Sequence, residues 1–389
     1  MKMIDLNAGN KRIRPVTYGL ALYFLLMATD SFPLGAVGSL LRIVAFIPLG
    51  LSLLDIRQMR IRFNPLMVFQ ILFLLLAVLS VFYSVLQSRT VSSIVTLALN
   101  LALVFVLGSV QRYSEAEVNL LYKAMLYGSW LTVLLMLAFS HISSDGRLSL
   151  QLGEGIQDQN YINGYMLFAF SFHSNAALSE RKWRHLIAAL LIMGIVLLTG
   201  SRGAFVAYVA VALLYLVLMV IGTGKPLRNL VVLMVLVIMA SCFIELVLEQ
   251  MPESVSERFS WDFIMQHGTT GRTRVWRHFW EHFCDDSIMR MLFGHGYGTS
   301  ATVNQLNDLV AHNLYLDNLI TLGIVGLILQ ILTQGYVFSE LIRQKSTVVL
   351  GTYIGLLAMC LSLSLVAYKP IWNIMLFTLI TRYRMNEKR

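Results

Sequence analysis

Two arginines and a histidine stand where apolar segments of this chain meet polar ones. Arg202 follows Gly200-Ser201 and opens an apolar stretch. A guanidinium beside glycine backbone and a helix N-terminus suits a phosphate, because its forked donors add to the positive end of the helix dipole. The alternative is an arginine that snorkels to lipid headgroups.

A second candidate segment runs from residue 271 to residue 283. Its apolar residues recur at helical spacing, which predicts an amphipathic helix on a membrane surface. Arg272 near its start is expected to reach a phosphate, and Arg274 to assist it. The alternative is an interfacial helix without chemistry. The predicted apolar face comprises Val275, Trp276, Phe279, Trp280 and Phe283.

His312 directly precedes another apolar segment. An imidazole at an interface can accept a proton near neutral pH, so His312 is a candidate general base. A structural role at the start of a helix is the alternative. Asn313 and Asp317 are one helical turn apart, which predicts a polar stripe entering the membrane, and Asn313 is a candidate for substrate binding.

Three further residues are candidates for substrate binding. Arg42 lies inside an apolar segment, where an arginine indicates either a ligand site or a salt bridge. Asp158 and Asn160 could hydrogen-bond sugar hydroxyls or cap the helix expected from Tyr161. His295, within the glycine-rich run 294–298, is expected to be a turn residue.

The composition indicates the elements that must position these residues. The chain has 389 residues, of which 57% are hydrophobic and 13% charged. Repeated apolar runs near the length of a bilayer's hydrocarbon core predict an all-α integral membrane fold. We expect one polytopic membrane domain, residues 1–389, with about twelve transmembrane helices. They are predicted near residues 16–30, 34–54, 65–87, 91–110, 118–140, 161–179, 185–200, 203–221, 229–249, 313–339, 348–367 and 370–383.

Charge sets the expected orientation. The net charge is +9, and lysines and arginines concentrate in the loops that share the side of the N-terminus. Positive loops mark the cytoplasmic side. We therefore expect both termini to be cytoplasmic and the long segment 251–311 to be a large extracytoplasmic loop that carries the amphipathic helix. Nucleic acid is not an expected partner.

Sequence motifs for metals and nucleotides are missing. The three cysteines, Cys242, Cys284 and Cys360, form no CxxC pair, and there is no HExxH or Walker A motif. We expect neither a metal nor a cofactor. The apolar segments hold too few acids to indicate a proton or sodium relay.

The ordered motifs across residues 155–330 resemble the bacterial O-antigen polymerase and O-antigen ligase superfamily. Residues 158–161 resemble its Asp-x-Asn segment, and residues 199–204 its Ser-Arg-Gly motif. Gly271-Arg272 with Trp276 resembles the arginine of its large outer loop, and residues 293–296 its glycine element. His312-Asn313 followed by Gly323 and Gly326 is similar to the ligase-type His-Asn signature.

The resemblance implies a chemistry. It implies a donor glycan on undecaprenyl pyrophosphate, a glycan acceptor and sugar transfer without metal at the outer face of the bacterial cytoplasmic (inner) membrane. Arg202 and Arg272 would hold the pyrophosphate leaving group, and His312 would be the general base. Direct displacement would invert the anomeric centre.

Three functions remain as alternatives. The leading one is a polymerase that joins lipid-linked repeat units into O-antigen, capsule or exopolysaccharide. The second is a ligase that transfers a finished glycan to lipid A-core or another acceptor. A flippase for lipid-linked oligosaccharides, from another class, predicts internal repeats and charges near the midplane. The sequence leaves open whether a chain-length regulator is a partner.

Overall fold

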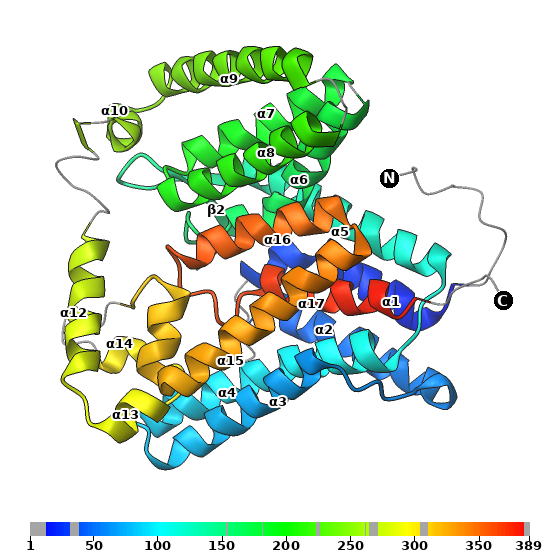
Figure 1. Ribbon diagram of the computed structural model, residues 1–389, viewed down its shortest axis with the longest axis vertical. Helices are drawn as coiled ribbons and strands as arrows, with labels where there is room; N and C mark the ends of the chain where they lie inside the picture. Colours follow the sequence, from blue (N-terminus) through cyan, green and yellow to red (C-terminus); the bar gives the residue numbers. More distant parts are fainter. Residues whose placement is uncertain are drawn as a thin grey trace.

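The computed structural model describes residues 13–31, 39–152, 155–180, 182–222, 226–260, 262–263, 271–303 and 310–384. It is a bundle of helices with one small sheet (Figure 1). In it, the helices of the predicted loop lie apart from the first and last helix ends of the bundle. Helix α1 begins and α17 ends on the side of the bundle opposite α10 and α12.

In the first half of the chain, the helices coincide closely with the predicted apolar segments. They are α1 (Pro15–Leu25), the 3-10 helix η1 (Met27–Ser31), α2 (Leu40–Ser52), η3 (Leu53–Gln58), α3 (Pro65–Leu79), η4 (Ser80–Phe82), α4 (Gln87–Ala102), the π-helix η5 (Leu103–Val110), α5 (Glu115–Ala138), α6 (Asn163–Glu180) and α7 (Trp183–Leu198).

The second half holds the predicted loop and the last helices. In order these are α8 (Arg202–Gly222), α9 (Pro226–Glu249), α10 (Glu253–Ser256), η6 (Glu257–Phe259), α12 (Arg272–Cys284), α13 (Ile288–Phe293), α14 (Ser300–Val303), α15 (Leu314–Gln344), α16 (Thr347–Cys360) and α17 (Lys369–Arg382).

Local sequence fixes several helix starts. Ser114 and Glu117 form a capping box at α5, in which each side chain accepts a hydrogen bond from the other residue's backbone N–H. At α3, the Asn64 side chain accepts from the Met67 N–H, and Pro65 supplies a preset φ at the first helical position.

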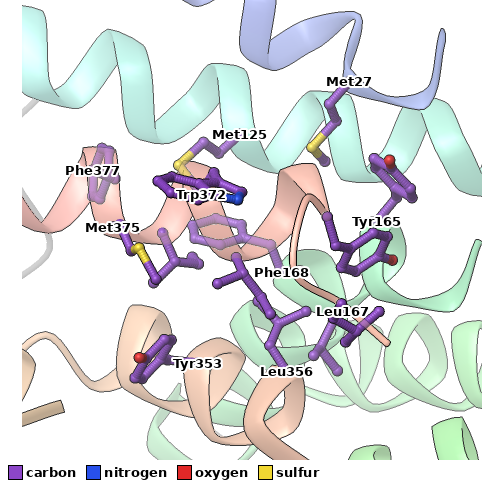
Figure 2. Close-up of a cluster of buried hydrophobic side chains, with 14 of the residues drawn as sticks. Met27, Met125, Tyr165, Leu167, Phe168, Tyr353, Leu356, Trp372, Met375 and Phe377 are labelled. Carbon is purple, nitrogen blue, oxygen red and sulfur yellow. The ribbon is translucent and has the colours of Figure 1, made fainter. Parts of the chain in front are cut away.

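The core joins helices from both halves of the chain. Figure 2 shows Met125 of α5, Phe168 of α6, Leu356 of α16 and Trp372 of α17 converging on one apolar cluster. Each of these four side chains is at most 6% exposed. Burial of such side chains drives the association of α6, which precedes the predicted loop, with helices that follow it.

The helices bear out the membrane character of the chain. Five described stretches are long and apolar enough to cross a membrane: Pro65–Phe82, Gln87–Val110, Glu115–Ala138, Arg202–Ile221 and Leu314–Gln344. Each of the twelve predicted segments contains a helix, although residues 34–38 of the second lie outside the described residues. Several of these helices are shorter than a bilayer is thick, so twelve spans stays a prediction.

The all-α prediction was incomplete. Between α5 and α6 the chain forms an antiparallel sheet of three strands, β1 (Ser140–Ile142), β2 (Leu148–Leu152) and β3 (Gly155–Ile156), in the order β1-β2-β3. Ser140 pairs with Leu150, and Gln151 pairs with Ile156. The alternation of apolar and polar residues from Leu148 to Leu152 is typical of a strand, but the prediction considered only long apolar runs.

Helix α15 is interrupted at Gly323, whose φ of 68° and ψ of −166° are not helical. The break frees backbone carbonyls, which are costly to leave unpaired in a membrane protein. The His295 N–H donates to the Ile320 carbonyl over 3.0 Å, and the Gly296 N–H donates to the Thr321 carbonyl over 3.0 Å. The glycine-rich run 294–298 therefore donates the backbone hydrogen bonds that the broken helix lacks.

The predicted amphipathic helix is present as α12. Its Phe279 and Phe283 are buried against Leu319 and Ile320 of α15, whereas Trp280 is 54% exposed. The predicted apolar face therefore packs largely on protein rather than only on a membrane surface. Arg272 is the first residue of α12, which packs on α15, and its charge acts on His312, just before α15.

Candidate active site

The segment before α8 is held in a tight turn. Gly200 has a φ of +60°, a conformation that glycine adopts without steric cost. A Cβ atom at Gly200 would lie 3.1 Å from Arg147 Nε, so the bare backbone also makes room for that side chain. The Thr199 hydroxyl accepts a hydrogen bond of 3.0 Å from Asn163 Nδ2, which ties the turn to α6.

Arg147 connects two of the motif segments, and the sequence analysis missed it. Its Nε donates to the Thr199 carbonyl over 2.8 Å, and its Nη2 donates to Asn160 Oδ1 over 3.2 Å. The residue is only 8% exposed. In the sequence it is a single basic residue ahead of the alternating run 148–152, which carries no chemical signal by itself.

Arg202 and Arg272 lie close together in the structure. Arg272 Nη1 would be 4.0 Å from a Cβ atom at Gly203, the residue after Arg202. The positive charges of Arg258 and Arg272 both act on Arg202. Its guanidinium carbon stands 5.6 Å from the centre of the Phe263 ring, within the range of a cation–π interaction.

Four arginines thus share one region, which we call the arginine cluster: Arg147, Arg202, Arg258 and Arg272. Burial, and then the neighbouring positive charge of Arg258, lower the pKa of Arg147. Burial is also the main cause that lowers the pKa of Arg272. Among the described residues, Arg202, Arg258 and Arg272 form no salt bridge with a carboxylate. Partly buried like charges without counter-ions favour an anionic ligand.

His312 stands beside this cluster in a strained backbone conformation. Its φ is 48°, in the left-handed region that a non-glycine residue enters at a cost of about 1 kcal/mol or more. Its Nδ1 is buried without a hydrogen-bond partner in the described structure. Burial and the positive charge of Arg272 lower the pKa of His312, against an opposing effect of Asp158. The imidazole is therefore neutral near pH 7, the state that accepts a proton.

The residues on either side hold His312 in place. Trp276 Nε1 of α12 donates to the Ala311 carbonyl over 2.8 Å. Asn313 caps α15, since its Oδ1 accepts from the backbone N–H groups of Tyr315 and Leu316, at 3.0 and 3.2 Å. Asn313 Nδ2 donates to the Leu361 carbonyl over 3.1 Å. These contacts give Asn313 a positioning role.

Asp158 lies between the arginine cluster and a cavity. Its charge acts on Arg272 and on His312. Its Oδ1 accepts from the Asn160 backbone N–H and side-chain amide, at 2.7 and 3.0 Å. Asn160 in turn accepts from Arg147, so both residues predicted to bind substrate are connected to the cluster.

The cavity has a volume of about 470 Å³, within the size range of small-molecule sites. Arg42 and Asp158 both line it, which brings together two predicted binding residues from distant parts of the sequence. Arg42 Nη2 donates to Thr96 Oγ1 over 3.1 Å. The salt bridge considered for Arg42 is not formed with any described residue.

Arg274 differs from Arg272. It is exposed on α12, and the structure groups Arg272, not Arg274, with Arg202.

His295 is more than a turn residue. His295 Nε2 and Asp286 Oδ2 are 2.7 Å apart, and the His295 Nδ1 atom lies 3.0 Å from Arg290 Nη1. With His282, these residues form a His282–Asp286–His295 group whose ligand atoms lie within 4.8 Å of one another. A metal could bind there by donor type, but the Asp–His–Arg hydrogen bonds already use both nitrogens of His295.

One comparison bears on the family. Residues 187–331 match the family model described as O-antigen ligase. This match supports the predicted resemblance of the chain to the O-antigen polymerase and ligase superfamily. No curated protein sequence matches the chain.

The match fits the geometry of the site. It spans Arg202, Arg272 and His312, whereas Arg42, Arg147 and Asp158 lie before it. Together with several membrane-length helices, the match supports an integral membrane enzyme of O-antigen or related polysaccharide assembly. The matching family implies a lipid-linked glycan and an acceptor as substrates.

Proposed function

We propose that this protein polymerises undecaprenyl-pyrophosphate-linked oligosaccharide repeat units into a cell-surface polysaccharide. The observation that carries this proposal is the arginine cluster beside a neutral histidine: among the described residues only Arg147 of the four pairs with a carboxylate, Asp145 at 3.9 Å, whereas Arg202, Arg258 and Arg272 form no salt bridge. A pyrophosphate supplies the missing negative charge, and a histidine supplies the base that an acceptor hydroxyl needs.

The reaction is a direct displacement. The acceptor hydroxyl oxygen forms a bond to the anomeric carbon of the donor while the bond from that carbon to the pyrophosphate oxygen breaks. The hydroxyl proton passes to His312. The electron pair leaves with the pyrophosphate, whose growing charge Arg202 and Arg272 stabilise. Attack from the face opposite the leaving group inverts the anomeric centre.

The remaining predicted residues act in binding. Asp158 would contact sugar hydroxyls from the wall of the cavity, with Asn160 hydrogen-bonded to it, and Arg42 would bind within the cavity. Arg274, exposed near Arg272, would meet the donor phosphates from outside. Asn313 would act mainly by holding the start of α15, and hence His312.

The proposed orientation follows from charge. Both termini would be cytoplasmic, and the loop 251–311 and the arginine cluster would face outward from the cytoplasmic membrane. The separation of α12 from the start of α1 and the end of α17 supports this arrangement (Figure 1). We propose that transfer requires no metal, because arginines supply the charge that a metal would otherwise provide.

A ligase is the second candidate, and the description of the matching family favours it directly. It would use the same arginine cluster and base but transfer the glycan to lipid A-core. The flippase alternative has less support, because the predicted site residues gather at one region and the chain matches a family of assembly enzymes.

The test uses purified full-length protein with one lipid-linked repeat unit as the only substrate, and a gel that resolves glycan length. A ladder of products supports the polymerase. Transfer that begins only when lipid A-core is added makes the protein a ligase. Neither product, from correctly folded protein, would return the flippase to consideration.

Variants test the assigned roles in the same assay. Arg202→Ala and Arg272→Ala should abolish product at unchanged protein level, and Arg277→Ala, an exposed arginine of α12, should leave it unchanged. Wild-type activity in His312→Ala would remove the general-base role.

A further inference from the structure

The cavity beside Asp158 has a second positive residue that the proposed reaction does not use. Lys369, the first residue of α17, lines the cavity with Arg42 of α2 and is only 3% exposed. Its Nζ donates to Asn100 Oδ1. A lysine buried this deeply is uncommon without a carboxylate partner, and among the described residues Lys369 forms no salt bridge.

Both cations have donors left for a ligand. An ammonium has three N–H donors and a guanidinium five. The described structure gives Lys369 one side-chain acceptor, Asn100 Oδ1, and gives Arg42 one, Thr96 Oγ1. Asp30 also lines the cavity, but its two carboxylate oxygens accept hydrogen bonds from Ser39 and Tyr165, each of 2.8 Å. Its single negative charge offsets one of the two positive charges, and the charge of Asp158, the other carboxylate of the walls, acts on Arg272 and His312.

The other walls of the cavity suit a sugar. Tyr161, Tyr165 and Tyr368 offer aromatic rings, and Asp158 and Gln157 offer groups that hydrogen-bond hydroxyls. Aromatic surface combined with a few placed polar groups is typical of small-molecule sites. Two cations in the same walls add recognition of an anion.

The cavity also adjoins the reaction centre. Asp158 is part of its wall, and the charge of Asp158 acts on both His312 and Arg272. A glycan in the cavity would therefore present a hydroxyl toward the base, whereas the arginine cluster holds the donor's pyrophosphate.

We propose that this cavity is the acceptor site, and that Arg42 and Lys369 bind an anionic group, a phosphate or a carboxylate, on the acceptor glycan. This inference rests on the proposed transfer function and assigns its second substrate. The anion has two sources: the phosphate of the acceptor's lipid carrier, or an acidic sugar in the glycan itself.

The experiment measures steady-state transfer with Arg42→Gln, Lys369→Gln and the double variant, alongside the surface control Arg277→Gln. The first acceptor probe is a repeat unit joined to polyprenyl pyrophosphate through a non-cleavable phosphonate, so that it serves as acceptor only and the normal lipid-linked unit is the donor. We expect the KM for acceptor to rise about tenfold in each single variant, as for the loss of one charge-assisted hydrogen bond. The KM for donor and the melting temperature should stay at their wild-type values.

Two further probes distinguish the sources of the anion. One is the same glycan as a neutral methyl glycoside, and the other is the lipid-linked glycan with its sugar carboxylates methyl-esterified. If the variants lose their defect with the methyl glycoside, the phosphate is the ligand. If they lose it with the ester, the sugar carboxylate is the ligand.

Other outcomes overturn the proposal. An unchanged acceptor KM in the double variant, or an equal rise in the KM for donor and acceptor, means that the cavity is not an acceptor site for an anionic glycan. Direct binding of the methyl glycoside and of the lipid-linked unit to His312→Ala protein, with and without Arg42→Gln and Lys369→Gln, gives a readout that needs no turnover. Binding that depends on the two cations while wild-type protein transfers nothing would sink the proposed reaction but keep the site.

Discussion

The Arg147 guanidinium donates a hydrogen bond of 2.8 Å to the backbone carbonyl of Thr199, three residues before Arg202. The contact fastens the small sheet, which follows α5, to the turn from which α8 begins. Arg147 is therefore a positioning residue for Arg202.

We expect Arg147→Ala to lower both stability and activity, because it leaves the Thr199 carbonyl and Asn160 Oδ1 without their charged donor. Loss of one such bond costs about 1.5–3 kcal/mol. Thermal unfolding in detergent measures the first effect, and the KM for donor measures the second. Arg184→Ala removes an exposed arginine and serves as control. Wild-type donor KM in a folded Arg147→Ala protein would contradict the positioning role.

The break in α15 predicts a stability difference between glycines of one helix. In Gly323→Ala the new methyl group collides with backbone atoms of Leu292, at a φ of 68° that alanine rarely adopts. We expect a large loss of stability, beyond the roughly 1 kcal/mol of an ordinary backbone effect.

Gly335→Ala in the same helix is the matched control, because nothing lies within 4 Å of its added methyl group. Alanine in a helix interior should stabilise by about 0.5–1 kcal/mol. Melting temperatures that move in opposite directions confirm the break, and equal shifts argue for a continuous helix.

The strained backbone of His312 predicts that glycine is tolerated there better than alanine. His312→Gly removes the imidazole and relieves a φ of 48°, so its melting temperature should exceed that of His312→Ala. Both variants should lose transfer activity. Added imidazole should restore part of the activity of His312→Gly, because the vacated space adjoins the acceptor hydroxyl. If added imidazole restores no activity to His312→Gly, the result counts against a general base at this position.

The electrostatics of His312 predict the pH profile. Only the neutral imidazole accepts a proton, so activity should rise with pH through an apparent pKa below the ordinary 6.5 and then stay level. Asp158 raises the pKa of His312, and therefore Asp158→Asn should move this acid limb to lower pH. Residual activity of Arg272→Gln should show the opposite shift, because Arg272 lowers the same pKa. An acid limb that stays in place in both variants would assign it to another group.

Chelation and metal analysis test whether transfer depends on a metal ion. Because the His295 nitrogens already bond Asp286 and Arg290, we expect extensive chelation to leave transfer unchanged. Metal analysis of protein purified without added metal checks the His282–Asp286–His295 group directly. Stoichiometric zinc that is lost in His282→Ala, together with activity, would contradict a metal-independent reaction.

The sequence by itself determined the class of the protein and supplied the candidate chemical residues. Apolar runs set the helical membrane fold, because a backbone in lipid must satisfy its own hydrogen bonds. Local spacing predicted α12, since amphipathic periodicity depends only on neighbours along the chain. Arg202 and His312 became candidates because charged or titratable residues at the ends of apolar segments are costly, and Arg272 because it stands near the start of the amphipathic segment.

Only the tertiary structure decided which residues meet. Arg147 and Lys369 carry no local signal, and their roles arise from contacts with Thr199 and Asn100, far away in the sequence. The interruption of α15 at Gly323 depends on donors from the loop at residues 295 and 296. Contacts of this kind are set by packing between distant segments, which hydropathy and spacing along one chain do not encode.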